Sequence, residues 1–389
     1  MSIKDDKVTN QANPQFSSLQ FDTSFQKHWR IPLYLSIALL ISSVFNSELF
    51  HALIELFAIG IAIMSFVVSW HTYAFSRNQF LLYLGCGYFW IGVIDLFHTL
   101  SFQGLQIFES LELGASIQFW IVGRYLEAII LLAAPVTLIK AFKPKFIFIG
   151  IGLVCSIALA SIFSHQFPAM FIEGQGLTTA KIASEYTIIS ILVLAALHLR
   201  LKRYNIDAST KKLLLASIVL TILAELCFTI YTGLSTPALL IGHIFKFLSF
   251  WAIYQALIES ALTRPFESLS RVVRSYDSVS EATVIIDQFG TIQQANKIVR
   301  NMFEYNVVGH HCHKILHDQS IPQAECSICQ CIDTKKSLQD FEFYNEKDLN
   351  WYEATLSALH LGETFSTMVH TRRQITARKI SEEQFASLS

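Results

Sequence analysis

The stretch FLLYLGCGYFWIGVIDLFHTL, residues 80–100, predicts a membrane-spanning helix. It is apolar over the length that a helix needs to cross a bilayer, about 17–25 residues. Similar runs occur at residues 31–45, 52–73, 118–139, 146–163, 183–199, 213–231 and 238–262. The sequence therefore predicts a multi-pass α-helical membrane bundle of about eight helices, of which the first is the shortest.

Lysine and arginine are concentrated in every second connection between these runs. They are Lys27, Arg30, Arg77, Lys140, Lys143, Lys145, Arg200, Lys202, Arg203, Lys211, Lys212 and Arg264. The intervening connections contain Lys181 and the acidic residues Glu48, Glu109, Glu112 and Glu173. Because short positively charged loops stay in the cytoplasm, this pattern predicts that both termini are cytoplasmic. We expect a protein of the cytoplasmic (inner) membrane with a cytoplasmic tail at 1–30 and no signal-peptide cleavage site.

The composition separates a membrane region from a water-soluble one. Hydrophobic residues make up 52% of the chain and charged residues only 15%, which is unusual for a soluble domain. Residues 265–389 nevertheless contain 12 Lys and Arg and 16 Asp and Glu. The net charge of −1 gives no basic surface for nucleic acid, so the expected partner of the apolar region is the lipid bilayer.

Ionisable residues interrupt the apolar runs in pairs three residues apart, a spacing that places both on one helical face. The pairs are Asp95 with His98, Arg124 with Glu127, and His243 with Lys246, and Glu225 lies within a further run. With the predicted topology, the three pairs fall in the outer half of the bilayer. Glu55 and Glu185 lie close to expected helix ends, so we interpret them as interfacial.

Two interpretations of these intramembrane groups remain open at this stage. They can form a ligand or ion site, because ionisable residues within a membrane usually mark one. They can also neutralise one another and hold helices together, with Arg124 paired to Glu127 or Asp95 and Lys246 paired to Glu225. An ion transporter or channel would use similar groups, although no inverted repeat is visible.

Histidine placement allows a further alternative. His98 and His243 are expected at outer depth, while His71 and His198 are expected at inner depth on two other helices. Paired histidines at two depths are how a membrane cytochrome can hold two haems. Haem in the membrane domain is therefore a possible cofactor, and a haem-binding redox protein is an alternative function.

Two segments resemble a known sensory family. GCGYFWIGVIDLFHTLSFQG at 85–104 and QFWIVGRYLEAIILLAAP at 118–135 closely resemble the third type of the bacterial membrane-associated sensor (MASE) domain. The resemblance runs from about 33 to 258. It implies an integral-membrane input domain, assigned here to 31–262, of the kind found at the N-terminus of histidine kinases and diguanylate cyclases.

The region after the last apolar run begins with a short apolar stripe. Leu262, Phe266, Leu269, Val273 and Tyr276 follow one another at alternating steps of four and three residues. This spacing indicates a linker helix at 263–280, and we favour a parallel pairing of two copies through it. The alternative is an amphipathic helix that packs on its own domain.

In the next segment apolar and polar residues alternate, as they do in β-strands. Runs at 282–287, 291–295, 337–344, 350–359 and 365–371, with a short helix near 297–305, predict a five-stranded antiparallel α+β sheet. VIIDQFGTIQQAN resembles the opening of a PAS sensory domain, with Asn296 at the start of the helix. We assign the PAS domain to 281–376 and the start of an exit helix to 377–389. Gln374 stands where PAS domains usually have Asp before Ile-Thr, which puts the usual salt bridge or cap in question.

A cysteine- and histidine-rich string, GHHCHKILHDQSIPQAECSICQC, lies between the second and third predicted strands. Its candidate metal or redox residues are Cys312, His317, Cys326, Cys329 and Cys331, with further histidines at 310, 311 and 313. Such residues can hold zinc or an iron–sulfur cluster. Inert thiols are the alternative.

These features predict a membrane-bound sensory protein, not an enzyme, since no phospho-acceptor helix, ATP-binding domain or nucleotide cyclase is visible before Ser389. Its input would be a small molecule, an ion or a redox state. We expect a homodimer that signals to a separate kinase, cyclase or response-regulator partner. The alternative is that the chain is a fragment of a kinase or cyclase.

Overall fold

The computed structural model describes residues 25–388 except 103–104, 106, 109–110, 113, 139–141, 173, 175, 203, 205, 231–235, 318–321, 335, 347 and 362–363. Expectations for most of the N-terminal tail and for Glu109, Lys140, Glu173 and Arg203 therefore lie outside the described residues. The chain divides into two compact units, Met1–Pro265 and Phe266–Ser389, which we describe separately.

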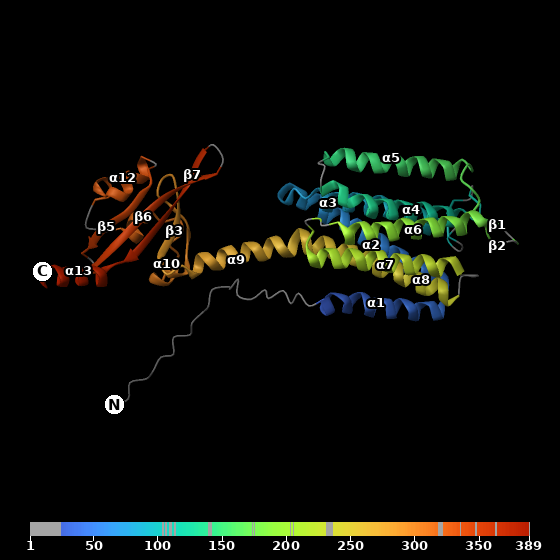
Figure 1. Cartoon of the computed structure of the whole chain (residues 1–389), viewed down its shortest axis with the longest axis horizontal. Helices are drawn as coiled ribbons and strands as arrows, with labels where there is room; N and C mark the ends of the chain where they lie inside the picture. The colour runs from blue at the N-terminus through green and yellow to red at the C-terminus, as the bar shows by residue number, and fades with distance from the viewer. Residues whose placement is uncertain are drawn as a thin grey trace, which may run out of the picture. The chain divides into compact units, whose positions relative to one another are not determined.

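The first unit is a bundle of helices joined by short connections (Figure 1). Its helices are α1 (Phe25–Phe45), α2 (Ser47–Ser76), α3 (Gln79–Leu100), α4 (Ala115–Ala133), α5 (Pro144–Phe163), α6 (Thr179–Leu201), α7 (Ala208–Ile230) and α8 (Pro237–Ile258). Of the described helices, α2 to α8 are long and apolar enough to cross a membrane, while the apolar part of α1, Trp29–Phe45, is shorter. The predicted multi-pass helical membrane fold is confirmed.

Contacts between the helices give the bundle a closed inner ring. The helices α2, α3, α4, α6, α7 and α8 pack in that order, and α8 returns to α2. Helix α1 packs outside the ring against α2, and α5 packs outside it against α3. The approach of α2 to α3 is close at Gly85, where an added Cβ atom would lie 2.4 Å from the Ser69 hydroxyl oxygen. A small residue is therefore required there for the helices to meet.

Helix α8 leads without a break into a further helix. A π-helical turn, η2 (Glu259–Thr263), follows it, and α9 (Arg264–Ser278) begins at once. Arg264 forms ion pairs with Glu259 and with Asp207, the residue before α7. On α9 the side chains of Phe266, Leu269 and Val273 are exposed. The predicted linker helix is present.

The second unit contains a five-stranded antiparallel sheet. Its strands are β3 (Ala282–Asp287), β4 (Ile292–Ala295), β5 (Leu338–Asn345), β6 (Asn350–Leu361) and β7 (Thr364–Gln374). They lie in the order β4-β3-β7-β6-β5, so the last strand along the chain occupies the centre. The predicted α+β PAS fold is confirmed.

Short helices connect the second and third strands of this sheet. They are α10 (Lys297–Met302), α11 (Cys312–Leu316), η3 (Gln323–Glu325) and α12 (Ser327–Asp333). Asn296 joins this connection to the sheet, because its buried side-chain oxygen accepts hydrogen bonds from the Thr283 amide at 3.1 Å and the Val299 amide at 3.2 Å. The same side chain thereby caps α10 and holds the start of β3 in place.

The junction with the exit helix α13 (Thr376–Leu388) contains the Gln that replaces the usual PAS aspartate. The Gln374 amide donates to Asn350 Oδ1 at 2.6 Å, and the Thr376 hydroxyl donates to the same oxygen at 2.9 Å. Thr376 also accepts from the Trp351 amide. At Gln374 the usual charged contact is thus replaced by neutral hydrogen bonds to Asn350, while Arg378 at the start of α13 forms ion pairs with Glu342 and Glu353.

Candidate functional site

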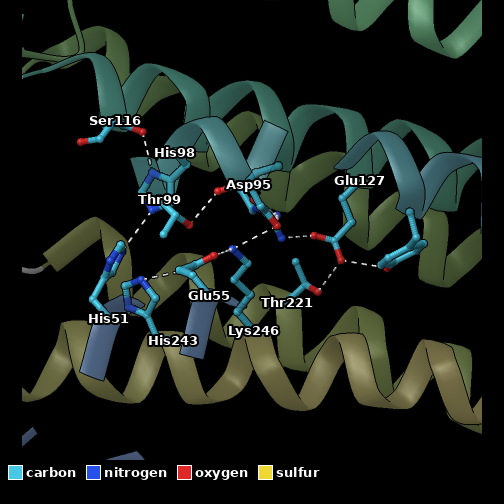
Figure 2. Close-up of polar contacts among 12 residues, drawn as sticks. His51, Glu55, Asp95, His98, Thr99, Ser116, Glu127, Thr221, His243 and Lys246 are labelled. Atoms are coloured by element: carbon cyan, nitrogen blue, oxygen red, sulfur yellow. Dashed lines mark hydrogen bonds and ion pairs between the residues drawn. The ribbon is translucent and has the colours of Figure 1, made fainter. Parts of the chain in front are cut away.

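A chain of buried ion pairs crosses the centre of the helical ring (Figure 2). Lys246 on α8 donates to Glu55 on α2 at 2.6 Å and forms an ion pair with Asp95 on α3 at 3.1 Å. Nη2 of Arg124 on α4 donates to both carboxylate oxygens of Asp95, at 3.0 and 3.1 Å, and Nη1 pairs with Glu127. None of these side chains is more than 2% exposed. Four helices are thus joined by charges that have no access to water.

Neutral groups complete this network. The Tyr88 hydroxyl donates to Glu127 at 2.9 Å, and the Thr221 hydroxyl of α7 lies 3.4 Å from the same carboxylate oxygen. The indole ring of Trp120 lies 4.6 Å from Lys246 Nζ and 4.8 Å from the Arg124 guanidinium carbon, distances at which cations and aromatic faces attract. Three carboxylates face two cations, so the ionised network carries one net negative charge.

The structure corrects three predicted placements. Glu55, interpreted as interfacial, is buried at one end of the network, because Asn46 caps α2 and the helix begins several residues earlier than expected. Lys246 pairs with Glu55 and Asp95 and not with Glu225. Glu185 is also buried, on α6, where it pairs with Lys181, a residue that we had placed in a loop.

Glu225 is separate from the ion-pair chain. It is fully buried on α7, and its two carboxylate oxygens have no hydrogen-bond partner among the described residues. A buried carboxylate without such partners is costly when ionised. Glu225 therefore differs from the other site residues predicted in the membrane domain, which take part in the ion pairs or hydrogen bonds described here.

Three histidines adjoin the network at the end of the bundle where α3 ends and α8 begins. His98 on α3 and His51 on α2 face each other with their Nε2 atoms 3.2 Å apart, and His243 Nε2 on α8 lies 3.4 Å from Glu55 Oε1. A cavity of about 40 Å³ opens beside them, lined also by Trp120 and Phe228. This volume exceeds that of a single water molecule. The site can therefore accept a small ligand or ion.

The histidines predicted at the other depth do not form a matching pair. His71 is exposed on α2, and His198 on α6 accepts or donates a hydrogen bond of 2.6 Å to the Tyr204 hydroxyl. At the first depth, the predicted pair His98 and His243 lies in one buried group with His51 and Glu55, and the ligand atoms of these four residues are within 4.8 Å of one another. Haem in the membrane domain stays a prediction.

The second candidate site lies in the PAS domain. His313, His317, Cys326 and Cys329 are buried, and their ligand atoms lie within 4.8 Å of one another. His317 Nδ1 lies 3.4 Å from Cys326 Sγ and 3.5 Å from Cys329 Sγ. Cys312 and Cys331, predicted as further candidates, are outside this group. His313 belongs to the group in their place. Its spacing of four residues from His317 is the sequence signal that could have identified it.

Protonation in this PAS group is uneven. A hydrogen bond with the Cys329 thiol, and then one with His317, lowers the pKa of Cys326 to about 3. The same contact with Cys326, together with burial, raises the pKa of Cys329. Burial lowers the pKa of His317 and raises that of Cys312 to about 12. The group thus holds one thiolate beside a neutral imidazole, the forms that bind metals.

His51 is the membrane-site residue that the sequence analysis missed. It precedes Glu55 by four residues, so both lie on one face of α2. We had started this helix at residue 52, which left His51 in a loop. Asn46 followed by Ser47 and Glu48 is a helix-start signal, and it would have included His51.

A membrane-spanning helical bundle with a buried polar site, followed by a PAS domain, defines a membrane-bound sensory protein. The model of the MASE3 family, described as a membrane-associated sensor domain, matches residues 42–265, and the chain belongs to this family. Among solved structures, the PAS domain of an HTR-like protein from Haloarcula marismortui is similar at 18% identity and a TM-score of 0.24, over 30% of this chain and 99% of that one. No curated protein matches the chain.

Proposed function

We propose that the membrane domain senses a small ligand or ion at the histidine-lined cavity and transmits its occupancy through α8 to the PAS domain. The observation that carries this proposal is the position of Lys246. This residue of α8 binds Glu55 of α2 and Asp95 of α3, next to the cavity. Helix α8 is also the element that continues through the π-helical turn into α9.

A stimulus acts only if it binds two conformations with different affinity. Anything that enters the cavity meets His51, His98 and His243, and His243 shares Glu55 with Lys246. A change in the charge or position of Glu55 therefore alters the contact that holds α8 to α2. The π-helical turn at Glu259–Thr263 has one extra residue per turn, and such turns are frequent at functional sites.

The charge distribution supports an orientation for this domain. Arg77 follows α2, Lys143 and Lys145 precede or begin α5, and Arg264 follows α8. By the positive-inside rule, we propose that these ends are cytoplasmic, in a bacterial inner membrane with both termini inside. The cavity, at the opposite ends of α3 and α8, then opens toward the outside.

The exposed apolar side chains of α9 support the pairing of two copies. Phe266, Leu269 and Val273 are each at least 50% exposed, an unfavourable state for a helix in water. We propose a parallel dimer through this stripe that passes the signal to a kinase, cyclase or response-regulator partner. Tyr276 has a different role from the one expected, because its hydroxyl donates to the Thr283 carbonyl within the PAS unit.

Hydrogen exchange of the full chain in lipid nanodiscs tests this function. Glu55→Gln removes the charge that holds Lys246, and we expect faster or slower exchange of α8 and α9 amides than in the wild-type chain. Glu48→Gln, an exposed residue in the first turn of the same helix, is the matched control and should change nothing there. Unchanged exchange in α9 with Glu55→Gln would contradict transmission through α8.

The PAS cysteine–histidine group supports a second input, a bound metal. Two thiols and two imidazoles are the ligand set of tetrahedral zinc sites, whereas iron–sulfur clusters more often use four thiolates. Neighbouring ligands of such a zinc ion lie about 3.6 Å apart, given the usual bond lengths. The 3.4 and 3.5 Å separations of His317 Nδ1 from the two sulfur atoms agree with this value.

Metal analysis of the purified chain checks this second input. We expect Cys326→Ser to lose one equivalent of zinc per chain. The control is Cys331→Ser, which removes a cysteine of α12, the helix that follows Cys326, but lies outside the group. Equal metal content in both variants would show that the group holds no metal.

A further inference from the structure

We infer that His51, Glu55, His98 and His243 form a binding site for one divalent transition-metal ion of the zinc class within the membrane domain. The four side chains are buried, and their ligand atoms lie within 4.8 Å of one another. This inference rests on the proposed function, because it names the chemical class of ligand for the same cavity.

Two distances between the donor atoms are close to those around a tetrahedral ion. Zinc binds imidazole nitrogen and carboxylate oxygen at about 2.0–2.2 Å, so two neighbouring donors lie about 3.3–3.5 Å apart. His51 Nε2 lies 3.2 Å from His98 Nε2, and His243 Nε2 lies 3.4 Å from Glu55 Oε1. The three histidines come from α2, α3 and α8, so side chains that are far apart in the chain point toward one site.

Hydrogen bonds set the tautomers of two histidines for metal binding. His98 Nδ1 lies 2.7 Å from the Ser116 carbonyl oxygen, and His243 Nδ1 lies 2.8 Å from the Leu239 carbonyl oxygen. A carbonyl only accepts, so each Nδ1 carries the hydrogen and each neutral ring has its lone pair on Nε2, the atom that faces the group. Backbone carbonyls hold metal-binding histidines in this way in known sites.

The atoms that face the centre of this group lack other partners. His243 Nε2 and Glu55 Oε1 have no hydrogen-bond partner among the described residues, although both are buried. Lys246 occupies the other oxygen of Glu55, Oε2, and so orients the carboxylate without blocking Oε1. A bound ion would pair with the lone pairs of both buried atoms at once, which removes a desolvation cost.

The charges favour a cation over an anion. The network of Glu55, Asp95 and Glu127 with Lys246 and Arg124 carries one net negative charge, and the three histidines add none when neutral. Imidazole ligands exclude Mg²⁺ and Ca²⁺, which require oxygen ligands. Nitrogen-rich sites prefer zinc and copper. The cavity beside the histidines provides the route by which an ion enters.

Zinc binding to the full chain in detergent tests the inference directly. The background variant Cys326→Ser with Cys329→Ser removes the PAS ligands, so that any remaining site lies elsewhere. In this background we expect one Zn²⁺ per chain by titration. His98→Ala and His243→Ala should each weaken the affinity by ~100-fold or more, since even outer contacts of metal sites contribute 10–100-fold. His198→Ala, at a membrane histidine outside the group, should leave it unchanged.

A second measurement covers the case in which a variant fails to fold. Co²⁺ added to the wild-type chain should give the visible bands of a tetrahedral ion bound by nitrogen and oxygen, and excess Zn²⁺ should remove them. The thiolate charge-transfer band of the PAS site distinguishes the two ions. The inference is overturned if the background variant binds no Zn²⁺, or if neither His98→Ala nor His243→Ala weakens the affinity.

The outcomes separate this inference from the proposed function. If Zn²⁺ does not bind but Glu55→Gln still changes exchange in α9, then the metal assignment is wrong and transmission through α8 stands. If Zn²⁺ binds at the predicted residues but Zn²⁺ and Glu55→Gln both leave α9 unchanged, then the metal site stands and the transmission is wrong.

Discussion

Lys246 of α8 donates a hydrogen bond of 2.6 Å to Glu55 of α2, a residue 191 positions away in the chain. Both side chains are almost completely buried. A buried charge is tolerated only when it is paired, so this contact holds two helices of the inner ring in a defined register. It also places the charged group of α8 beside the histidine-lined cavity.

We expect Lys246→Met to lower the free energy of unfolding of the membrane domain by about 3–5 kcal/mol, because Glu55 is left buried without its partner. The double variant Lys246→Met with Glu55→Gln should recover part of this loss. Reversible unfolding in detergent micelles measures the difference. Lys212→Met, at an exposed position of α7, is the control. Purely additive effects of the two single substitutions would show that the pair is not coupled.

Tyr88→Phe tests the other end of the network. The substitution removes the hydrogen bond of 2.9 Å to Glu127 and leaves a buried carboxylate less well satisfied. We expect a loss of about 1–3 kcal/mol in the free energy of unfolding. Tyr83→Phe, one turn earlier on α3 and partly buried, should cost less. Equal losses at both positions would indicate that Glu127 does not depend on Tyr88.

A lower pH should lower the free energy of unfolding of the PAS domain because of His370 on β7. Burial, followed by the charge of His317, lowers the pKa of this fully buried ring well below its usual value. Its contribution to stability is therefore present above the pKa of the unfolded chain, near 6.5, and is lost as the pH falls below that value. We expect the wild-type chain to lose up to about 1.4 kcal/mol per pH unit in this range.

The corresponding measurement is urea unfolding of the PAS transition at pH 7.5 and pH 5.5 with a chelator present. His370→Leu should flatten the pH dependence, because the unfolded chain then has no histidine to protonate at this position. His310→Leu, at an exposed residue before α11, should leave the slope nearly as it is. A slope unaffected by His370→Leu would assign the acid sensitivity to other groups.

Asn296→Ala should destabilise the PAS domain by about 1–3 kcal/mol, since two buried backbone amides lose their acceptor. Asn296→Asp keeps an acceptor for both amides and should be milder, although it loses the donor to the Glu281 carbonyl. Thermal unfolding of the PAS transition in the full chain compares the two. Loss of the same size in both variants would contradict the capping role.

Much of the fold was predictable because it depends on local pattern. The apolar runs of α2 to α8 are long enough to cross a bilayer, and a helix satisfies all of its backbone groups within the segment. In the same way, the alternation of apolar and polar residues in β3 and β6 and the turn at Gly290 predicted the sheet. Helix ends were less predictable. The early start of α2 followed from the Asn46 cap, and it moved Glu55 from the interface to the interior.

The sequence alone determined that the chain crosses a membrane, that a PAS domain follows, and that Asp95, Arg124 and Lys246 are unusual in lipid. Hydropathy and short-range spacing carry this information, because each depends on residues close together in the chain. The three-dimensional packing was needed to show that Lys246 pairs with Glu55 and not Glu225, and that His51 and His313 each join three other buried side chains in a group. These pairings depend on how whole helices rotate and pack against each other, which no local pattern specifies.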